Sequence, residues 1–307
     1  MIAGNTVPAA EYKSVMVIIN PAAGIDRPIL GLLNSQFKDT GIKWDVRLTH
    51  AAGDAQALAR QAVADGYEVV AAHGGDGTVM EVANGLQGTS VPLAIFPGGT
   101  ANVMASELGV SADLPTCISM VAKRTCSALD MDMATANDLP FLLRVGIGFE
   151  ADMMKNADQE VKNRFGLLAY AFSAVNTLRT LKPSHYKIEV DGQPSEVDGI
   201  SCMIANSGNV AIGGLQLSNK IDIADGKLDV VVFTDANLST ILNLSMSVIT
   251  QADATAAPQI FHKQGQTITV SAEPHQSISL DGELLEADRV TASIMPHVLR
   301  VLVPAQQ

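Results

Sequence analysis

The chain has 307 residues, of which 47% are hydrophobic and 17% charged, and its formal net charge is −12. This length is enough for two domains with separate cores, and such an acidic chain is a poor candidate for a general nucleic-acid-binding protein. Three cysteines without a C-x-x-C spacing argue against a disulfide framework and a zinc site, and no apolar run approaches the roughly 18 residues that cross a bilayer.

Strands and helices alternate from Val15 to about Lys123. This alternation is typical of a parallel sheet wound with helices on both faces. Asp54 and Thr78 are natural caps for the helices that follow them. The expected strands are Val15–Ile19, Trp44–Leu48, Glu68–Ala72 and Val91–Phe96, and the expected helices run from Pro28 to about Asp39, Ala55 to Ala64, Val79 to Gly85 and Ala101 to Leu108.

The turn His73–Thr78 carries the clearest chemical signal in the chain. It follows the third strand and places Gly74, Gly75 and Gly77 around Asp76. Missing side chains let backbone N–H groups approach phosphate oxygens, and the following helix adds its positive end. A carboxylate beside a polyphosphate needs a cation between them, so the turn indicates a magnesium nucleotide. The alternative is an ordinary glycine turn with a solvated aspartate.

A second glycine turn, Pro97–Thr100, follows the next strand. It contains Gly99 and Thr100, and Asn102 lies just beyond it. Because the carboxyl ends of parallel strands share one edge of a sheet, both turns can converge on one ligand. Tight turns that only need small residues are the alternative.

Two more strand ends lead to the same edge. Asn20 begins the turn Asn20–Gly24 after the first strand, and Thr49 follows the second strand, where open α/β sheets bind nucleotides. The alternative for Thr49 is a hydroxyl that satisfies its local turn. Glu81, in the helix after the first glycine turn, completes the candidates for the nucleotide site.

The pattern changes after Ala128, where short strand-like runs and Asp-Gly turns become dominant. Such a pattern predicts an antiparallel β-sandwich. We therefore predict a nucleotide-binding domain over residues 1–127 and a β-sandwich domain over residues 128–307, with a cleft between them and the last strand a candidate to return to the first domain. The expected strands are Phe141–Val145, Tyr186–Val190, Ile200–Ala205, Leu228–Phe233, Thr267–Val270, Ser277–Leu280 and Val298–Val303.

These stretches resemble a known family of enzymes. Gly74–Thr78, together with Phe96–Asn102, is similar to the catalytic domain of the diacylglycerol kinase and sphingosine kinase superfamily, in its bacterial lipid kinase branch. The first stretch alone is shared with NAD kinases and resembles one in phosphofructokinases. The resemblance covers nearly the whole chain from Asn20 onward, and it implies that ATP with Mg²⁺ binds at the two glycine turns.

The second half contributes two further parts of the resemblance. Glu283 closes the Asp-Gly-Glu stretch that begins at Asp281, and the family implies that it is the general base for the acceptor hydroxyl. The alternative is a common hairpin turn. Asp222, Asp225 and Lys227 match a segment that holds a structural magnesium ion, through the Asp225 carboxylate and two backbone carbonyls. An exposed acidic hairpin is the alternative there.

Other parts of the resemblance are less complete. Gly146–Ala151 matches a segment that lines the acceptor pocket of the family. Met80 stands where the family usually has Asn, and the segment Lys220–Asp222 lacks a proline that many members have. The helical stretch Arg164–Leu181 has an apolar side and basic neighbours, which suits a membrane surface or a helix that covers the sandwich.

The residues and the resemblance together predict an ATP-dependent lipid kinase in which Asp76 and Glu283 face one another across the cleft. Diacylglycerol or a related lipid is the expected acceptor. A NAD kinase-like enzyme and a non-catalytic lipid-binding protein are the alternatives. We expect a cytoplasmic protein that binds no nucleic acid and makes peripheral contact with its lipid at the membrane surface. Homodimerisation is an option for such a protein.

Overall fold

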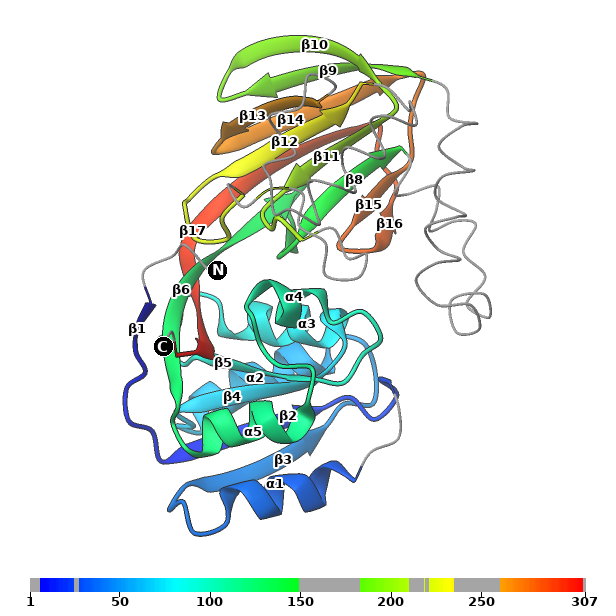
Figure 1. Cartoon of the computed structure of the whole chain (residues 1–307). Helices are drawn as coiled ribbons and strands as arrows, with labels where there is room; N and C mark the ends of the chain where they lie inside the picture. Colours follow the sequence, from blue (N-terminus) through cyan, green and yellow to red (C-terminus); the bar gives the residue numbers. More distant parts are fainter. Residues whose placement is uncertain are drawn as a thin grey trace. The chain divides into compact units, whose positions relative to one another are not determined.

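The computed structural model describes residues 6–24, 28–148, 183–209, 218, 221–234 and 260–305 (Figure 1). The chain divides into two units. Unit 1 comprises residues 1–132 and 296–307, and unit 2 comprises residues 133–295. Two predictions lie outside the described residues, namely the helical stretch 164–181 and the second half of the segment 146–151.

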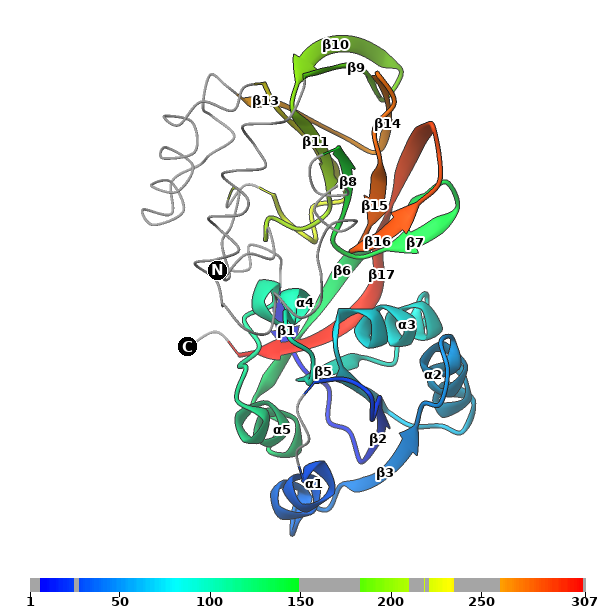
Figure 2. The same ribbon diagram turned by 90° about the vertical axis from the view of Figure 1, so that its right-hand side faces the viewer.

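Unit 1 contains a parallel sheet with the strand order β5-β4-β2-β3. Its helices form two layers: α1 packs with α5, and α2 packs with α3 on the other side of the sheet (Figure 2). The strands are β2 (Ser14–Ile19), β3 (Lys43–Leu48), β4 (Val69–Gly74) and β5 (Leu93–Pro97), and the helices are α1 (Ile29–Phe37), α2 (Asp54–Ala64), α3 (Asp76–Leu86), α4 (Val103–Glu107) and α5 (Leu114–Ala122).

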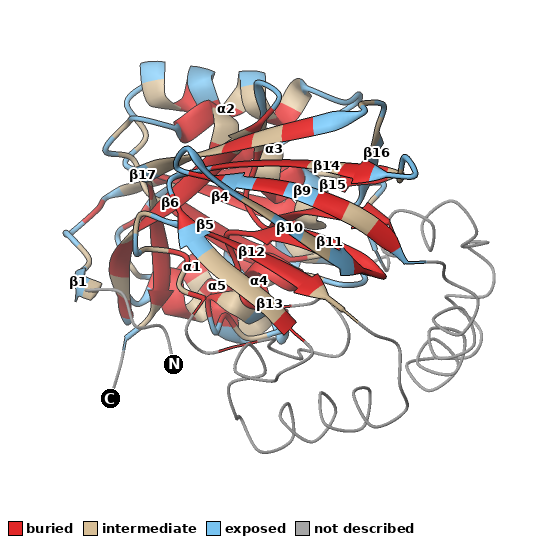
Figure 3. Cartoon of the chain, turned by 90° about the horizontal axis from the view of Figure 1, so that it is seen from above, coloured by how far each residue is buried: buried red, intermediate tan, exposed pale blue. Residues whose placement is uncertain are grey.

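The core of unit 1 explains this order of strands. Every residue of β4 and β5 is buried, as expected for strands covered by helices on both faces (Figure 3). The edge strand β3 is largely half-buried or exposed. A parallel sheet places all its strand ends along one edge, so the turns after β2, β4 and β5 lie close together.

Two long strands contribute residues to both units. These strands are β6 (Cys126–Ala136) and β17 (Arg289–Pro304). Within unit 1, Val301 of β17 pairs in parallel with Leu93 of β5, and the short strand β1 (Thr6–Pro8) pairs antiparallel with β6.

Unit 2 is an antiparallel β-sandwich. In one sheet β10, β9, β14 and β17 follow one another, and the second sheet has the order β13-β12-β11-β8-β15-β16. The sheets pack through β12 against β10 and β14, and through β13 against β9. The remaining bounds are β7 (Leu139–Phe141), β8 (Arg144–Gly148), β9 (Ser184–Val190), β10 (Gln193–Gly199), β11 (Ser201–Ala205), β12 (Leu228–Phe233), β13 (Ile260–Gly265), β14 (Thr267–Glu273), β15 (Ile278–Leu280) and β16 (Glu283–Leu285).

The predicted fold class is confirmed, but the helix starts are corrected. Helix α3 begins at Asp76 and has Gly75 as its N-cap, so Thr78 lies inside the first turn and is not the cap. Helix α2 begins at Asp54 with Gly53 as N-cap, and α4 begins only at Val103. The backbone N–H groups in the first turn of a helix have no intrahelical acceptor. Aspartate, glycine and threonine can therefore stand in that turn without loss of a helix hydrogen bond.

The strand expected over Phe141–Val145 was also wrong. It is divided into β7 and β8, and the two residues between them, Leu142 and Leu143, donate their backbone N–H groups to Asp281 instead of to a neighbouring strand.

Candidate active site

Within the first glycine turn, Gly75 alone lies between β4, which ends at Gly74, and α3, which begins at Asp76. Gly75 has an extended backbone and leads directly into the 11-residue helix α3, whose first N–H groups have no intrahelical partner. A Cβ on Gly74 would lie 2.6 Å from the Cβ of Thr78, so only hydrogen fits there. This geometry places backbone donors and the positive end of a helix at the edge of the sheet, which suits a phosphate.

Asn20 connects the end of β2 to the start of α3. Its side-chain amide donates a hydrogen bond to Thr78 Oγ1 (3.1 Å), and its backbone N–H donates to the carbonyl oxygen of His73 (2.9 Å). Its Oδ1 accepts from the N–H of Ala22 (3.0 Å). Asn20 and Thr78 therefore hold each other in place beside the glycine turn.

The second glycine turn is in contact with the first. The N–H of Gly98 donates to the carbonyl oxygen of Gly74 (2.9 Å), and a Cβ on Gly99 would lie 2.5 Å from the Cα of Gly75. The backbones can approach this closely only because both turns lack side chains. The structure thus brings the two turns together, while their binding of one ligand stays a prediction.

Asn102 and Thr100 differ in how they contribute to the second turn: Asn102 bonds within it, and Thr100 does not. Asn102 has a left-handed backbone (φ 48°), and its side chain accepts from Gly99 N–H (2.9 Å) and donates to the Gly99 carbonyl oxygen (2.8 Å). Its amide is therefore occupied within its own turn. Thr100 is exposed, and its hydroxyl makes no hydrogen bond with any described residue, so it is available to a ligand.

Asp76 links the two glycine turns through the helices that follow them. Its Oδ1 accepts a hydrogen bond from the backbone N–H of Met104 in α4 (3.0 Å). The second carboxylate oxygen has no hydrogen bond to the described part of the chain. Asp76 can therefore hold α4 with one oxygen and face a hydrated cation with the other.

Glu283 lies in unit 2, at the first position of β16. It is exposed and pairs with Leu280 across the hairpin of β15 and β16. The two turn residues, Asp281 (φ 44°) and Gly282 (φ 98°), both have left-handed backbones, as a two-residue hairpin turn requires. This hairpin gives Glu283 a fixed backbone and leaves its carboxylate open to a proton donor.

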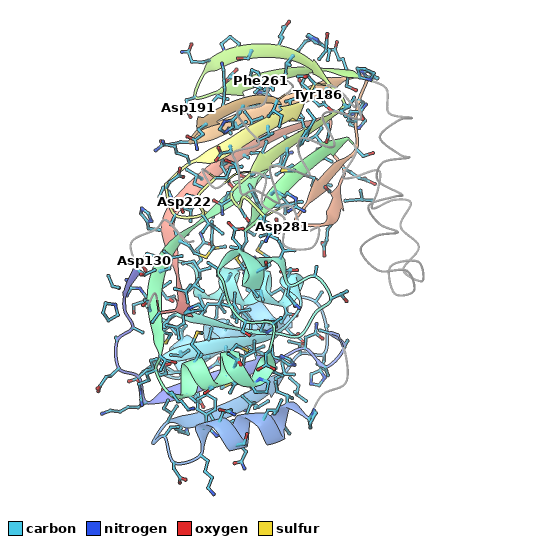
Figure 4. All side chains as sticks on the ribbon, viewed as in Figure 1. Asp130, Tyr186, Asp191, Asp222, Phe261 and Asp281 are labelled. Carbon is cyan, nitrogen blue, oxygen red and sulfur yellow. The ribbon has the colours of Figure 1, made fainter. Side chains whose placement is uncertain are left out.

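Asp281, whose side chain is labelled in Figure 4, is half-buried. It makes a set of hydrogen bonds that sequence reasoning missed. Its carboxylate accepts from the backbone N–H groups of Leu142 (2.8 Å), Leu143 (3.0 Å) and Arg144 (2.8 Å). Burial raises the pKa of Asp281, and the three amide hydrogen bonds oppose that rise. Only the identity of the turn, Asp followed by Gly, is visible in the sequence.

The predicted magnesium segment forms a loop just before β12. Asp225 Oδ1 accepts from Lys227 N–H (3.0 Å), and Asp222 Oδ1 accepts from Ala224 N–H (3.1 Å). Burial of its carboxyl raises the pKa of Asp225 to about 6, with smaller contributions from the charges of Asp229 and Asp222. Neighbouring negative charges of this kind fit a divalent cation, although the described residues contain no group of three or more His, Cys, Asp and Glu side chains that could hold one by themselves.

Comparisons with known proteins extend these observations. Residues 14–134 match the family model of the diacylglycerol kinase catalytic domain, and residues 144–303 match that of the YegS C-terminal NAD kinase beta sandwich-like domain. The chain belongs to the YegS-like lipid kinase family.

Relatives of this lipid kinase align over almost its full length. A Citrobacter koseri protein named Probable lipid kinase YegS-like is 30% identical, covering 96% of this chain and 97% of the relative. Probable lipid kinase YegS of Salmonella typhimurium is 28% identical with the same coverage. An uncharacterized Synechocystis protein is 30% identical and covers 96% of this chain and 71% of its own length.

Solved structures share the fold. A diacylglycerol kinase from Bacillus anthracis superposes with a TM-score of 0.71 at 22% identity, covering 96% of this chain and 98% of the other. Another Bacillus anthracis chain superposes with a TM-score of 0.75 at 24% identity and covers 96% of both chains. In the part of this lipid kinase that the structure describes, no helix is long and apolar enough to cross a membrane.

Glu81, which is predicted to belong to the nucleotide site, binds the backbone of a neighbouring helix in this lipid kinase. Both of its carboxylate oxygens accept backbone N–H groups at the start of α2, from Gly53 (2.8 Å) and Ala55 (3.0 Å). Glu81 therefore supports the loop after Thr49, and its part in nucleotide binding stays a prediction. Thr49 itself is buried, and its N–H donates to the carbonyl oxygen of Ile19 (3.0 Å).

His73 is a residue of the site that sequence reasoning passed over. It is buried at the end of β4, and its Nδ1 lies 3.0 Å from the carbonyl oxygen of Phe96 in β5. Its ring also fills the space beside Gly98, where a Cβ would lie 2.9 Å from His73 Cε1. His73 thereby connects the two strands that carry the glycine turns, and its position directly before Gly74 was the available signal.

Proposed function

We propose that this lipid kinase transfers the γ-phosphate of ATP to the hydroxyl group of a lipid, with diacylglycerol as the first candidate acceptor. The observation that carries the proposal is the contact between the two glycine turns at the edge of the unit 1 sheet. The contact supports the proposal because it concentrates unpaired backbone donors where a polyphosphate can be held.

Three features of unit 1 have a role in holding ATP in this proposal: the start of α3, Thr100 and Asp76. The N–H groups at the start of α3 bind phosphate oxygens, and the free hydroxyl of Thr100 adds a donor from the second turn. Mg²⁺, when bound with ATP, would supply positive charge that offsets the charge of the phosphates. The carboxylate oxygen of Asp76 that does not bind Met104 would accept hydrogen bonds from water molecules around that ion.

The chemical step has a simple balance. The lipid hydroxyl oxygen forms a bond to the γ-phosphorus while the bond from that phosphorus to the β–γ bridging oxygen breaks, and ADP leaves. The hydroxyl proton passes to the carboxylate of Glu283. In this proposal Asp222, Asp225 and Lys227 would hold a second, structural magnesium ion, whose charge would offset the acidic residues around Asp225.

The acceptor determines where the enzyme works. A diacylglycerol molecule remains in a bilayer, so the enzyme makes peripheral contact with the membrane surface and takes its acceptor from there. Homodimerisation is compatible with this arrangement and is not required by it.

A lipid panel tests the proposal. The purified protein is incubated with Mg²⁺, γ-labelled ATP and mixed micelles of diacylglycerol, phosphatidylglycerol, a sphingoid base or ceramide, with NAD in a separate reaction. We expect label in one of the lipids, diacylglycerol first, as read by mass spectrometry. Label in NAD and in none of the lipids would assign a NAD kinase instead, and lipid binding without uptake of nucleotide in calorimetry would assign a non-catalytic protein.

A further inference from the structure

Three hairpins in unit 2 have the same kind of turn. Each has a two-residue turn with positive φ at both positions, and each begins with an Asn or Asp whose backbone N–H donates to a carbonyl oxygen of another strand segment. The first turn residues and their acceptors are Asn137 with Thr291 (3.0 Å), Asp191 with Thr267 (2.9 Å) and Asp281 with Arg144 (3.0 Å).

The side chains of these turn residues differ in how many amides they hold. Asn137 accepts from one backbone N–H, that of Thr291, and Asp191 accepts from those of Gln266 and Thr267. Asp281 accepts from three consecutive N–H groups. Hydrogen bonds to an ionised acceptor are the stronger kind, so the hairpin of β15 and β16 is the most firmly attached of the three.

The segment to which Asp281 attaches is itself fixed. The buried side-chain amide of Asn206 donates to the carbonyl oxygen of Leu142 (2.7 Å). Arg144 is buried, and its Nη1 donates to the carbonyl oxygen of Asn209 (2.8 Å). Residues 142–144 therefore form a rigid support with hydrogen bonds on both sides.

The attached hairpin is also the one that carries Glu283. Asp281 and Glu283 are separated by Gly282 alone, and Glu283 has an exposed side chain that makes no hydrogen bond with any described residue. The side chain of Glu283 is thus free to react, while its backbone position depends on the turn that Asp281 holds.

We propose that Asp281 is the positioning residue of this kinase: by binding the N–H groups of residues 142–144, it sets where the carboxylate of Glu283 meets the acceptor hydroxyl. The inference rests on the proposed function, in which Glu283 takes the hydroxyl proton. A small displacement of a reacting group is enough to lose much of the rate, so the effect falls on kcat.

The chain offers a matched control for the test. Asp191→Asn and Asp281→Asn change the same turn position in the same unit, and Asn tolerates the left-handed backbone, so both variants keep the turn. An amide has a single acceptor oxygen. Asp281→Asn therefore loses at least one of its three bonds, because Asp281 uses both carboxylate oxygens. Asp191→Asn loses its charge and the second contact with Gln266 N–H (3.2 Å), while one oxygen can still accept from Gln266 and Thr267. Asp281→Ser, which keeps one acceptor, is a second variant for use if Asp281→Asn folds poorly.

The experiment measures kcat and KM for ATP, with the lipid that the parent enzyme labels most strongly in the panel above as the acceptor. Urea unfolding of each variant measures its stability. We expect Asp281→Asn to lower kcat about tenfold or more while KM for ATP stays within about twofold. Asp191→Asn should lose stability but keep kcat within about twofold of the parent. Introduced into Glu283→Gln, Asp281→Asn should lower kcat by no more than about twofold, because the group it positions is already gone.

Two outcomes overturn the positioning role alone. One is parental kcat in Asp281→Asn when Glu283→Gln is strongly impaired. The other is an equal loss of kcat from Asp281→Asn in both backgrounds, which would indicate a general structural effect. Parental kcat in Glu283→Gln alone would instead overturn the base assignment of the proposed function, and the positioning role with it.

Discussion

At the scale of single residues, the glycines of unit 1 are of two kinds. Gly74, Gly98 and Gly99 lie against other atoms of the chain, so the fold itself requires them. Gly77 is exposed in the first turn of α3, and a Cβ there would meet nothing within 4 Å. The fold does not require Gly77, so a ligand is the better explanation for a glycine at this position.

Gly77→Ala separates the two explanations. We expect the variant to be more stable by about 0.5–1 kcal/mol, since alanine favours a helix over glycine, while KM for ATP rises about tenfold or more because a methyl group stands where phosphate oxygens approach. Gly31→Ala is the control, because Gly31 is likewise exposed near the start of a helix with nothing within 4 Å. A Gly77→Ala enzyme with parental KM for ATP would remove Gly77 from the phosphate site.

Asp76 allows a similar separation of structure from chemistry. Asp76→Asn can still accept the N–H of Met104 but has lost its charge, whereas Asp76→Ala loses both. We expect Asp76→Asn to stay within about 0.5 kcal/mol of parental stability and to lose kcat about 100-fold, with more Mg²⁺ needed for half-maximal rate. Asp76→Ala should also lose about 1 kcal/mol of stability. Parental Mg²⁺ dependence in Asp76→Asn would show that Asp76 serves only to hold α4.

At the scale of elements, the sequence was sufficient for the core strands but not for the contacts between their loops. The runs that became β2, β4 and β5 are apolar because both of their faces are covered, and this signal is local. The bonds of Glu81 to the start of α2, and of Asp76 to α4, join residues 26 to 28 positions apart. No spacing rule predicts such pairs, so the support that Glu81 gives to the loop after Thr49 could not be predicted from the sequence.

The ion pair of β6 with β17 gives a pH test at this scale. Arg300 donates to both carboxylate oxygens of Asp130 (2.7 and 2.8 Å), and these hydrogen bonds hold the pKa of Asp130 below its ordinary value of 3.8. A carboxyl whose pKa is lowered by folding contributes stability above its ordinary pKa, and that stability is lost as the pH falls through the lowered value.

Asp130→Asn should therefore be less stable than the parent at pH 7, by less than about 1 kcal/mol because the pair is partly exposed. The difference should narrow as the pH falls below 3.8. Urea unfolding of both proteins across this range measures it. A difference that is the same at every pH would mean that the charge of Asp130 contributes nothing.

At the scale of the whole molecule, the family could be identified from short stretches while the acceptor could not. The glycine turns and the Asp-Gly-Glu stretch have backbone requirements that few residues satisfy, so they can be recognised from the sequence. A pocket for acyl chains can be built from many combinations of apolar residues. The departure at Met80 replaces an amide beside the first glycine turn, and a lower affinity for the nucleotide is the expected effect.

We propose that Glu283 of this lipid kinase takes the proton of a lipid hydroxyl as phosphate is transferred from ATP. The most direct measurement is the rate of label transfer from γ-labelled ATP to the preferred lipid, compared between the parent, Glu283→Gln and Glu286→Gln, a control at an exposed glutamate shortly after the same hairpin. We predict that Glu283→Gln transfers label at least about 100-fold more slowly, while Glu286→Gln stays within about twofold of the parent. Transfer by Glu283→Gln at the parental rate would show that Glu283 is not the general base.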